Sequence, residues 1–284
     1  MMLIVLSIIL FVLMLIFGGE RGLISFYALV GNIVVLLFCL YGMSWGISPI
    51  LITVVCSAAF IFLTLFYQNG NNLKTYTAAI AVLVVEVVLI ALVLLCVYKG
   101  HASGYSEVDM FEDNATFLSA DIAIDMKLVL VAVLLVGTLG SIMDTAVAIA
   151  SSMHELHVNN PDFSKWRLIV SGIHVGKYIM GTTVNTLFFA CLGETMMLTI
   201  LFIKFKYTIA KLMNSKAFFQ EICLVLMANI GCILIIPITI LLFCFLYKSE
   251  HKLAAKLRSY CEKAALKAAE AEAKEAVEKV TTAK

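Results

Sequence analysis

The chain has 284 residues, of which 62% are hydrophobic and 14% are charged, and its formal net charge is +1. Soluble domains are usually about 45–50% apolar, so this composition excludes an ordinary water-soluble protein. We recognise no nucleic-acid-binding motif, and the expected surroundings are a lipid bilayer rather than a nucleic acid.

Seven apolar stretches are long enough to cross a bilayer, whose hydrocarbon core of about 30 Å needs about 20 residues of helix. Lipid offers no hydrogen-bond partners to the backbone, so runs of this length are expected to be helical. With only 3 prolines and short connections, we predict an all-α, polytopic transmembrane bundle of about seven spans. The predicted spans are residues 2–17, 23–42, 48–66, 76–98, 128–151, 179–203 and 219–247.

The first predicted span does not have the features of a cleavable signal peptide. No basic leader precedes its apolar run, and no small-residue cleavage site precedes Gly18-Gly-Glu-Arg21. We therefore expect it to remain in the membrane as a span.

The charged connections predict the orientation. Residues 99–127 are acidic, whereas residues 153–178 and the tail after Tyr247 are basic. Basic segments usually stay in the cytoplasm, so we predict a multi-pass plasma-membrane protein with a cytoplasmic C-terminus and an N-terminus outside. The lysines between residues 204 and 216 oppose this orientation, but reversing the chain would export the more basic tail.

The acidic connection contains Asn114-Ala-Thr116, a glycosylation sequon that matters only in a eukaryotic secretory setting. Residues 111–126 are compatible with an interfacial amphipathic helix and equally with a solvated loop.

Residues 249–284 form a second predicted region, separate from the transmembrane bundle of residues 1–248. They are rich in Ala, Lys and Glu, which are strong helix formers. Pairs such as Glu270 with Lys274 have the favoured i,i+4 order. We expect a cytoplasmic helix that is either simply solvated or a docking arm for a partner protein.

Asp144, near the middle of the fifth predicted span, is the most informative residue. An ionised carboxylate at the centre of a bilayer costs roughly 2.5–3.5 kcal/mol on insertion scales. We therefore expect it to face the bundle interior, where it is paired, hydrated or used. At 100° per residue, its helix face is otherwise made of small residues and one acid: Gly137, Gly140, Ser141, Ala148, Ser151 and Glu155.

The sixth predicted span carries a matching face of small and polar residues, namely Lys177, Gly181, Thr182, Asn185 and Gly193. Small residues let membrane helices approach closely, and polar residues form hydrogen bonds between them. We predict a tight contact between these two spans, with Asp144 near Thr182 or Asn185. Asp144 would then either exchange a proton or a cation, or serve only as a hydrogen-bonded link between helices.

Glu86, within Val84-Val-Glu-Val-Val88, is the second acid near the middle of a predicted span. It either takes part in the same coupling or pairs structurally with a polar group such as Asn32 or Asn229.

Catalysis, metal binding and cofactor binding are not predicted. His154-Glu-Leu-His157 lacks a fixed third ligand. Gly172-Ile-His-Val-Gly-Lys177 is one residue short of a P-loop and follows no strand. Seven of the 8 cysteines lie singly in predicted spans, as packing residues do. No nucleophile and base are recognisable as a set, so we do not expect an enzyme.

Several motifs resemble those of the YibE/F-like family of bacterial membrane proteins, over about residues 21–245. They are Gly70-Asn-Asn-Leu-Lys-Thr75, Gly140-Ser-Ile-Met-Asp144 through Glu155, Asn160-Pro161, Ser171-Gly-Ile-His-Val-Gly176, Met180-Gly-Thr-Thr-Val-Asn-Thr-Leu187, Glu221, Asn229-Ile-Gly231 and Pro237-Ile-Thr239. The resemblance implies a polytopic plasma-membrane protein. It also implies a partner, either a related membrane protein with an extracytoplasmic domain or a second copy of this chain.

Three positions depart from the family pattern. Lys177 replaces an Arg, Tyr178 stands where an acid often follows, and Leu224 stands where a basic residue is expected. A conducting charge pair formed by those positions is therefore in doubt for this chain. A weaker likeness to helices of SecF-type and RND permeases, which couple an intramembrane acid to proton movement, is an analogy only.

These observations lead to the hypothesis of a proton- or cation-coupled transport or export component. Asp144 would be the titrating group and Glu86 a second acid, with Thr182 and Asn185 as hydrogen-bonding neighbours. A cytoplasmic gate would consist of Glu155 and Lys177. The alternative is a non-transporting membrane subunit that anchors or stabilises a partner protein.

Overall fold

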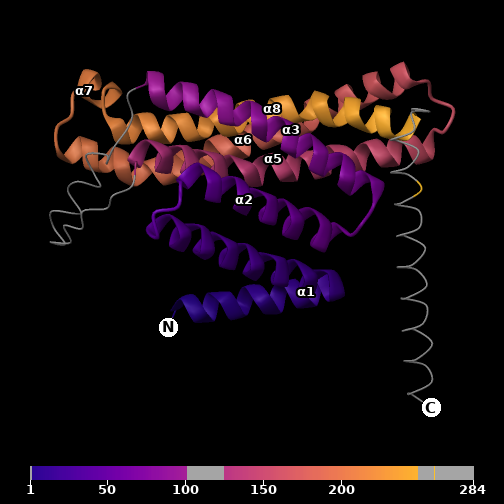
Figure 1. The fold of residues 1–284 in the computed structure, drawn as a ribbon, viewed down its shortest axis with the longest axis horizontal. Helices are drawn as coiled ribbons and strands as arrows, with labels where there is room; N and C mark the ends of the chain where they lie inside the picture. The colour runs from indigo at the N-terminus through magenta and orange to yellow at the C-terminus, as the bar shows by residue number, and fades with distance from the viewer. Residues whose placement is uncertain (1, 101–124, 249–258, 260–284) are drawn as a thin grey trace, which may run out of the picture.

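A computed structural model describes residues 2–100, 125–248 and 259, and all of its regular elements are helices, as predicted. The predicted sequon, the candidate interfacial helix at 111–126 and the tail helix lie outside the described residues. In chain order the elements are α1 (Met2–Ser44), α2 (Pro49–Ile61), the π-helix η1 (Phe62–Tyr67), α3 (Leu73–Lys99), α5 (Met126–Asn159), α6 (Lys165–Lys204), α7 (Ile209–Met213) and α8 (Lys216–Lys248) (Figure 1).

Six helices in the described part of the chain are long and apolar enough to cross a membrane. The first two predicted spans are the two arms of α1, which meet at Gly19. Gly19 has φ 54° and ψ −132°, a conformation that glycine adopts easily because it lacks a Cβ. The chain reverses there (Figure 1), and the rings of Phe11 and Phe26 on the two arms lie 4.7 Å apart.

Side-chain caps mark the starts of the two helices that form the candidate site. The Asp125 carboxylate accepts a hydrogen bond from the Lys127 amide at 2.9 Å, and α5 follows. The Ser164 hydroxyl accepts from the Arg167 amide at 3.3 Å, and α6 follows. Such caps satisfy backbone N–H groups that have no partner within the first helical turn.

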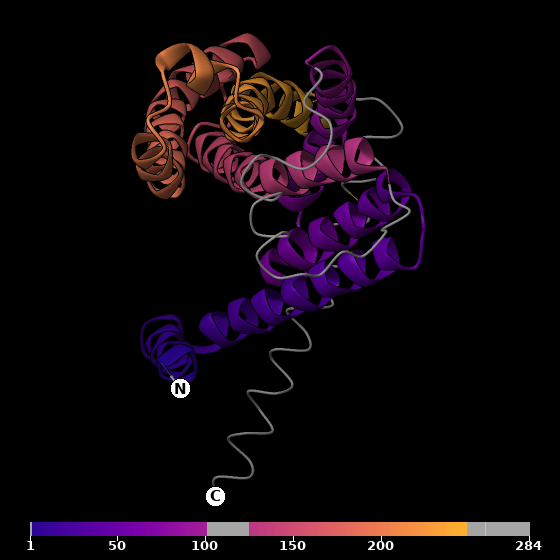
Figure 2. The same cartoon turned by 90° about the vertical axis from the view of Figure 1, so that its left-hand side faces the viewer.

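The core lies where α3, α5 and α8 pack together, and α1 and α6 are peripheral (Figure 2). In the most apolar window of each helix, 50% of the residues are buried in α8, but only 12% in α6 and 11% in α1. Gly231 permits a close approach of three helices in the core. A Cβ at that position would lie 2.8 Å from Ile142 on α5 and 3.2 Å from Leu89 on α3.

At each end of the bundle, segments that are distant in sequence lie close together. The α2–α3 and α5–α6 connections and the end of α8 lie together, at the right in Figure 1. There the Tyr247 hydroxyl and the His154 Nδ1 atom are 3.1 Å apart. The end of α3 and the start of α8 meet at the opposite end, where a Cβ at Gly100 would lie 2.7 Å from Phe219.

Candidate functional site

A cavity of about 340 Å³ separates α5 from α6 at the level of Asp144. Its lining residues are Ser141, Asp144, Thr145 and Ala148 from α5, and Ile179, Thr182, Thr183, Thr186 and Leu187 from α6. The structure thus brings Asp144 and Thr182 to one cavity, and the Asp144 side chain is exposed there.

The packing of α5 explains why Asp144 faces this space. Ile142, Met143 and Ala146 are buried in the core on the side of α5 that faces α3 and α8. Because side chains three and four residues apart share a helix face, burying that side turns Asp144 and Ala148 toward α6.

The hydroxyl groups that line the cavity donate their hydrogens to carbonyl oxygens of their own helices. The bonds run from Ser141 to Thr138 (3.0 Å), from Thr145 to Ser141 (2.8 Å), from Thr182 to Ile179 (2.9 Å) and from Thr186 to Thr182 (2.9 Å). A hydroxyl has one hydrogen to donate and two lone pairs to accept with. The oxygens of Ser141, Thr182 and Thr186 therefore remain available to the cavity as acceptors, whereas the Thr145 hydroxyl is buried and also lies 3.5 Å from Cys232 Sγ.

The charge of the lining also favours positively charged ligands. Asp144 is its one ionisable side chain, and no Lys, Arg or His belongs to it. A carboxylate and hydroxyl oxygens are the ligand types that hard cations prefer, and they also accept hydrogen bonds from water or hydronium. The cavity thus has the chemistry to hold a small cation or a proton carried by water.

The predicted tight contact between these two helices is wrong at the level of Asp144. A Cβ added at Gly140 or Gly181 would meet nothing within 4 Å. The helices approach closely nearer the connection between them, where a side chain at Gly172 of α6 would collide with Met153 of α5. They diverge from that point, and Gly140 and Gly181 border open space instead of a packed interface.

Asn185 lies on α6 with an exposed side chain and is not one of the residues that line the cavity. Thr183 and Thr186, which do line it, were not singled out from the sequence. Their signal was available, because Thr186 lies one turn after Thr182 and extends the same polar face.

Glu155 and Lys177 lie in the parts of α5 and α6 that are closest to the connection between them, and both side chains are exposed. Within the described ranges, the structure records no ion pair between them. Their role as a gate stays a prediction.

Glu86 is in different surroundings, because it is only 6% exposed and faces α2. The Ser57 hydroxyl donates to Glu86 Oε1 at 3.4 Å. Glu86 Oε2 is buried and has no hydrogen-bond partner. The acid is thus enclosed between two helices, with one weak hydrogen bond.

The partners predicted for Glu86 are incorrect. Asn32 donates to the Thr64 hydroxyl at 3.1 Å and so links α1 to η1. Asn229 donates to the Val225 carbonyl of its own helix at 3.0 Å. Ser57 takes the place expected for them because α2, rather than α1 or α8, supplies the polar group opposite Glu86.

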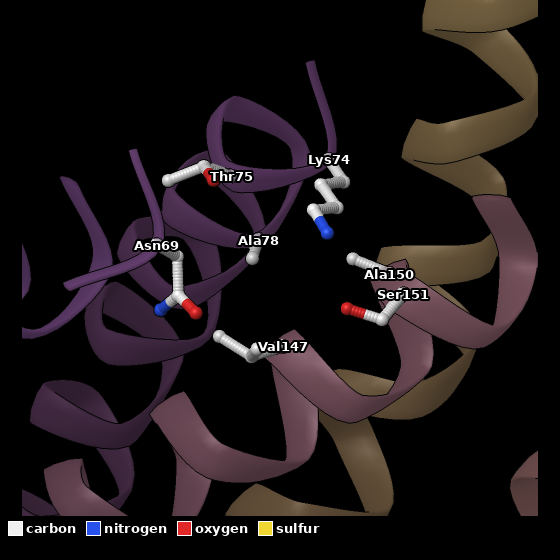
Figure 3. Close-up of a pocket in the computed structure, with 7 residues that line it drawn as sticks. All are labelled: Asn69, Lys74, Thr75, Ala78, Val147, Ala150 and Ser151. Carbon is white, nitrogen blue, oxygen red and sulfur yellow. The ribbon is translucent and has the colours of Figure 1, made fainter. Parts of the chain in front are cut away.

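A second, smaller pocket of about 10 Å³ lies beyond the cavity along α5 (Figure 3). Its lining residues are Asn69, Lys74, Thr75 and Ala78 on one side, and Val147, Ala150 and Ser151 of α5 on the other. The ammonium of Lys74 and the hydroxyl of Ser151 point toward each other across it (Figure 3). A space of this size holds about one water molecule. The only sequence signal for it was the motif Gly70-Asn-Asn-Leu-Lys-Thr75.

Comparison with known proteins gives one match. Residues 6–249 match the family model described as YibE/F-like protein, a range that includes all of α5 and α6. No curated protein and no solved structure matches the chain.

Proposed function

The chain belongs to the YibE/F-like family, and we propose that it acts as a proton- or cation-coupled transport or export component of the bacterial plasma membrane. The observation that carries this proposal is the carboxylate of Asp144 in a 340 Å³ cavity lined by hydroxyl acceptors. In this proposal the cavity lets the carboxylate release one bound proton or cation and take up another.

A charged side chain within the membrane carries a free-energy cost. An ionised acid at the centre of a membrane is expensive unless water, a cation or a proton neutralises it. The cavity is many times larger than the roughly 30 Å³ that one water molecule occupies in the liquid. It therefore has room for a cation together with part of its hydration shell.

The other residues of the proposed machinery follow from their positions. Thr182 and Thr186 on α6 would coordinate the cation or the proton-carrying water. Asn185, on the same helix but outside the cavity, would be its first contact. Glu155 and Lys177 would control access from the cytoplasmic end. Glu86, enclosed against Ser57, would support the bundle rather than exchange a charge.

One observation also favours the alternative of an anchoring subunit. α6 is a candidate span, yet Asn185 and Glu194, which do not line the cavity, have exposed side chains. Polar side chains at a lipid-facing surface are costly, and membrane proteins usually turn them toward other protein segments. A related membrane protein with an extracytoplasmic domain, or a second copy of this chain, would cover this face of α6.

The proposal is tested with the full-length chain purified in detergent. The midpoint of thermal unfolding is measured in NaCl, in KCl and in N-methylglucamine chloride at equal ionic strength. A ligand that binds only the folded state stabilises it, by about 2.7 kcal/mol at a hundred times its Kd. We expect a small cation to raise the midpoint and Asp144→Asn to abolish that rise. The matched control is Thr199→Val, on the same helix but outside the cavity.

Proton coupling is measured in proteoliposomes that contain a pH-sensitive dye, after an imposed pH difference. Asp144→Asn is expected to stop any proton flux of the wild-type chain. The proposal is abandoned if the wild-type chain shows neither response, or if Asp144→Asn keeps both in full. The anchoring alternative predicts instead that Asn185→Leu releases a co-purifying partner while Asp144→Asn retains it.

A further inference from the structure

Two cysteine side chains from distant parts of the sequence meet at one end of the bundle. Cys96 lies in the last turn of α3 and Cys223 near the start of α8, and their Sγ atoms are 3.2 Å apart. From the sequence both were interpreted as packing residues, because the cysteines lie singly in the predicted spans; these two are 127 positions apart. The folded chain makes them a pair.

Their surroundings hold the two sulfur atoms together. A Cβ at Gly100, just after Cys96, would lie 2.7 Å from Phe219, which is one turn before Cys223. The end of α3 and the start of α8 are thus in close contact about one turn beyond the pair. A disulfide has a sulfur–sulfur bond of about 2.05 Å, so the two sulfur atoms need to approach by roughly 1 Å.

We propose that Cys96 and Cys223 are a redox-active dithiol that closes to a disulfide joining α3 to α8. The oxidant is a disulfide compound, either a small molecule or a protein. This proposal does not depend on the role of Asp144.

The chemistry balances as a thiol–disulfide exchange. The Cys96 thiolate attacks one sulfur of the oxidant, forms a mixed disulfide and releases the other half as a thiolate. The Cys223 thiolate then attacks the Cys96 sulfur and releases the second half. The two protein thiols lose two electrons and two protons in total, and the oxidant is reduced to two thiols.

Accessibility sets the order of these steps. Cys96 is half-buried, whereas Cys223 is only 6% exposed. An external oxidant therefore reaches Cys96 first, and Cys223 acts as the resolving thiol from the core side.

The location suits such chemistry. The pair lies at the end of the bundle where α3 leads into the acidic connection, which is the predicted extracytoplasmic side. Disulfides persist in oxidising compartments outside the cytoplasm. A structural metal is a weaker interpretation, because the described residues include no group of three or more His, Cys, Asp or Glu that could hold one.

The test measures the oxidation state of each cysteine in the full-length, membrane-embedded chain. Membranes are treated with oxidised glutathione, free thiols are blocked with a light alkylating reagent, and disulfides are then reduced and labelled with a heavy reagent. Peptide mass spectrometry gives the heavy fraction at each position. We expect Cys96 and Cys223 to become oxidised together, to at least about ten times the level of Cys191. Cys191 is the matched control because it is also half-buried.

Cys96→Ser and Cys223→Ser test whether the two positions act as a pair. Cys96→Ser is expected to leave the buried Cys223 reduced, whereas Cys223→Ser is expected to trap Cys96 as a mixed disulfide with glutathione. The native-chain measurement also yields a cross-linked peptide that joins the two positions, so the test stands even if a variant fails to fold. The proposal is overturned if both thiols stay reduced at the level of Cys191, or if oxidation of the native chain gives no peptide in which the two positions are joined.

Discussion

Asp144 and Glu86 are both acids near the middle of apolar helices, yet the regions around them differ in nearly every physical respect. Asp144 is exposed in a 340 Å³ cavity between α5 and α6, among hydroxyl oxygens. Glu86 is 6% exposed between α2 and α3, with one 3.4 Å hydrogen bond and one oxygen without a partner. Position within a span is therefore a poor guide to the role of an intramembrane acid. The side chains that the opposite helix places near the acid are a better guide to its role.

This comparison predicts a clean separation of effects. Changes around Asp144 should alter the response to cations or protons and leave stability nearly intact, because the cavity contributes little packing. Changes around Glu86 should alter stability and leave that response intact. A variant near Glu86 that alters the cation or proton response, or a variant near Asp144 that strongly lowers stability, would contradict the comparison.

After the complete loss expected from Asp144→Asn, the largest effect is expected from the double change Thr182→Val and Thr186→Val. It keeps the side-chain shape and removes two acceptor oxygens from the cavity. Each lost hydrogen-bonding contact is worth about 1 kcal/mol, so the cation concentration for half of the thermal shift should rise about tenfold or more. Thr199→Val is the control, because its hydroxyl makes the same kind of bond, to the Thr195 carbonyl at 2.9 Å, outside the cavity. An equal loss in both variants would assign the effect to α6 as a whole.

A smaller effect, on stability alone, is expected from Ser57→Ala. The change removes the one hydrogen-bond donor to Glu86 and leaves a buried acid without a partner, which costs about 1–3 kcal/mol. The thermal midpoint should fall while the cation-dependent rise stays the same. Ser44→Ala is the control, since Ser44 is an exposed serine bonded to the Tyr41 carbonyl at 2.7 Å. Equal midpoints for the two variants would show that the Glu86 contact does not contribute to stability.

The smallest effect is expected from Glu86→Gln. The amide keeps an oxygen acceptor for the Ser57 hydroxyl and a similar volume. The half-maximal cation concentration should stay within about twofold of wild type, because the substitution leaves the Asp144 cavity unchanged. If Glu86→Gln instead removes the cation response as Asp144→Asn does, Glu86 shares the coupling and the contrast between the two acids fails.

The local properties of the chain were predictable to a useful degree. The helical class and the positions of the long apolar helices followed from hydropathy, and the motifs around Asp144 and Gly70 identified the family. The arms of α1 were predicted as separate spans, but the sharp reversal at Gly19 was visible only as a break between apolar runs.

The relations between helices were predicted less well. The face of α5 that carries Asp144 was expected to pack tightly against α6, but Gly140 and Gly181 border open space. Helical periodicity groups residues on one face, but it does not report how far away the neighbouring helix lies. For the same reason, the sequence could not predict that Glu86 pairs with Ser57 rather than with Asn32 or Asn229.

By itself the sequence determined that this protein is a bundle of apolar helices with two acids near the middle of their spans, because backbone hydrogen bonding in lipid depends only on local composition. Tertiary structure alone decided that one acid opens to a cavity, that the other is enclosed and that Cys96 meets Cys223. Those outcomes depend on helix rotation and tilt, which the close packing of side chains such as Ile142 against Gly231 sets across the whole bundle.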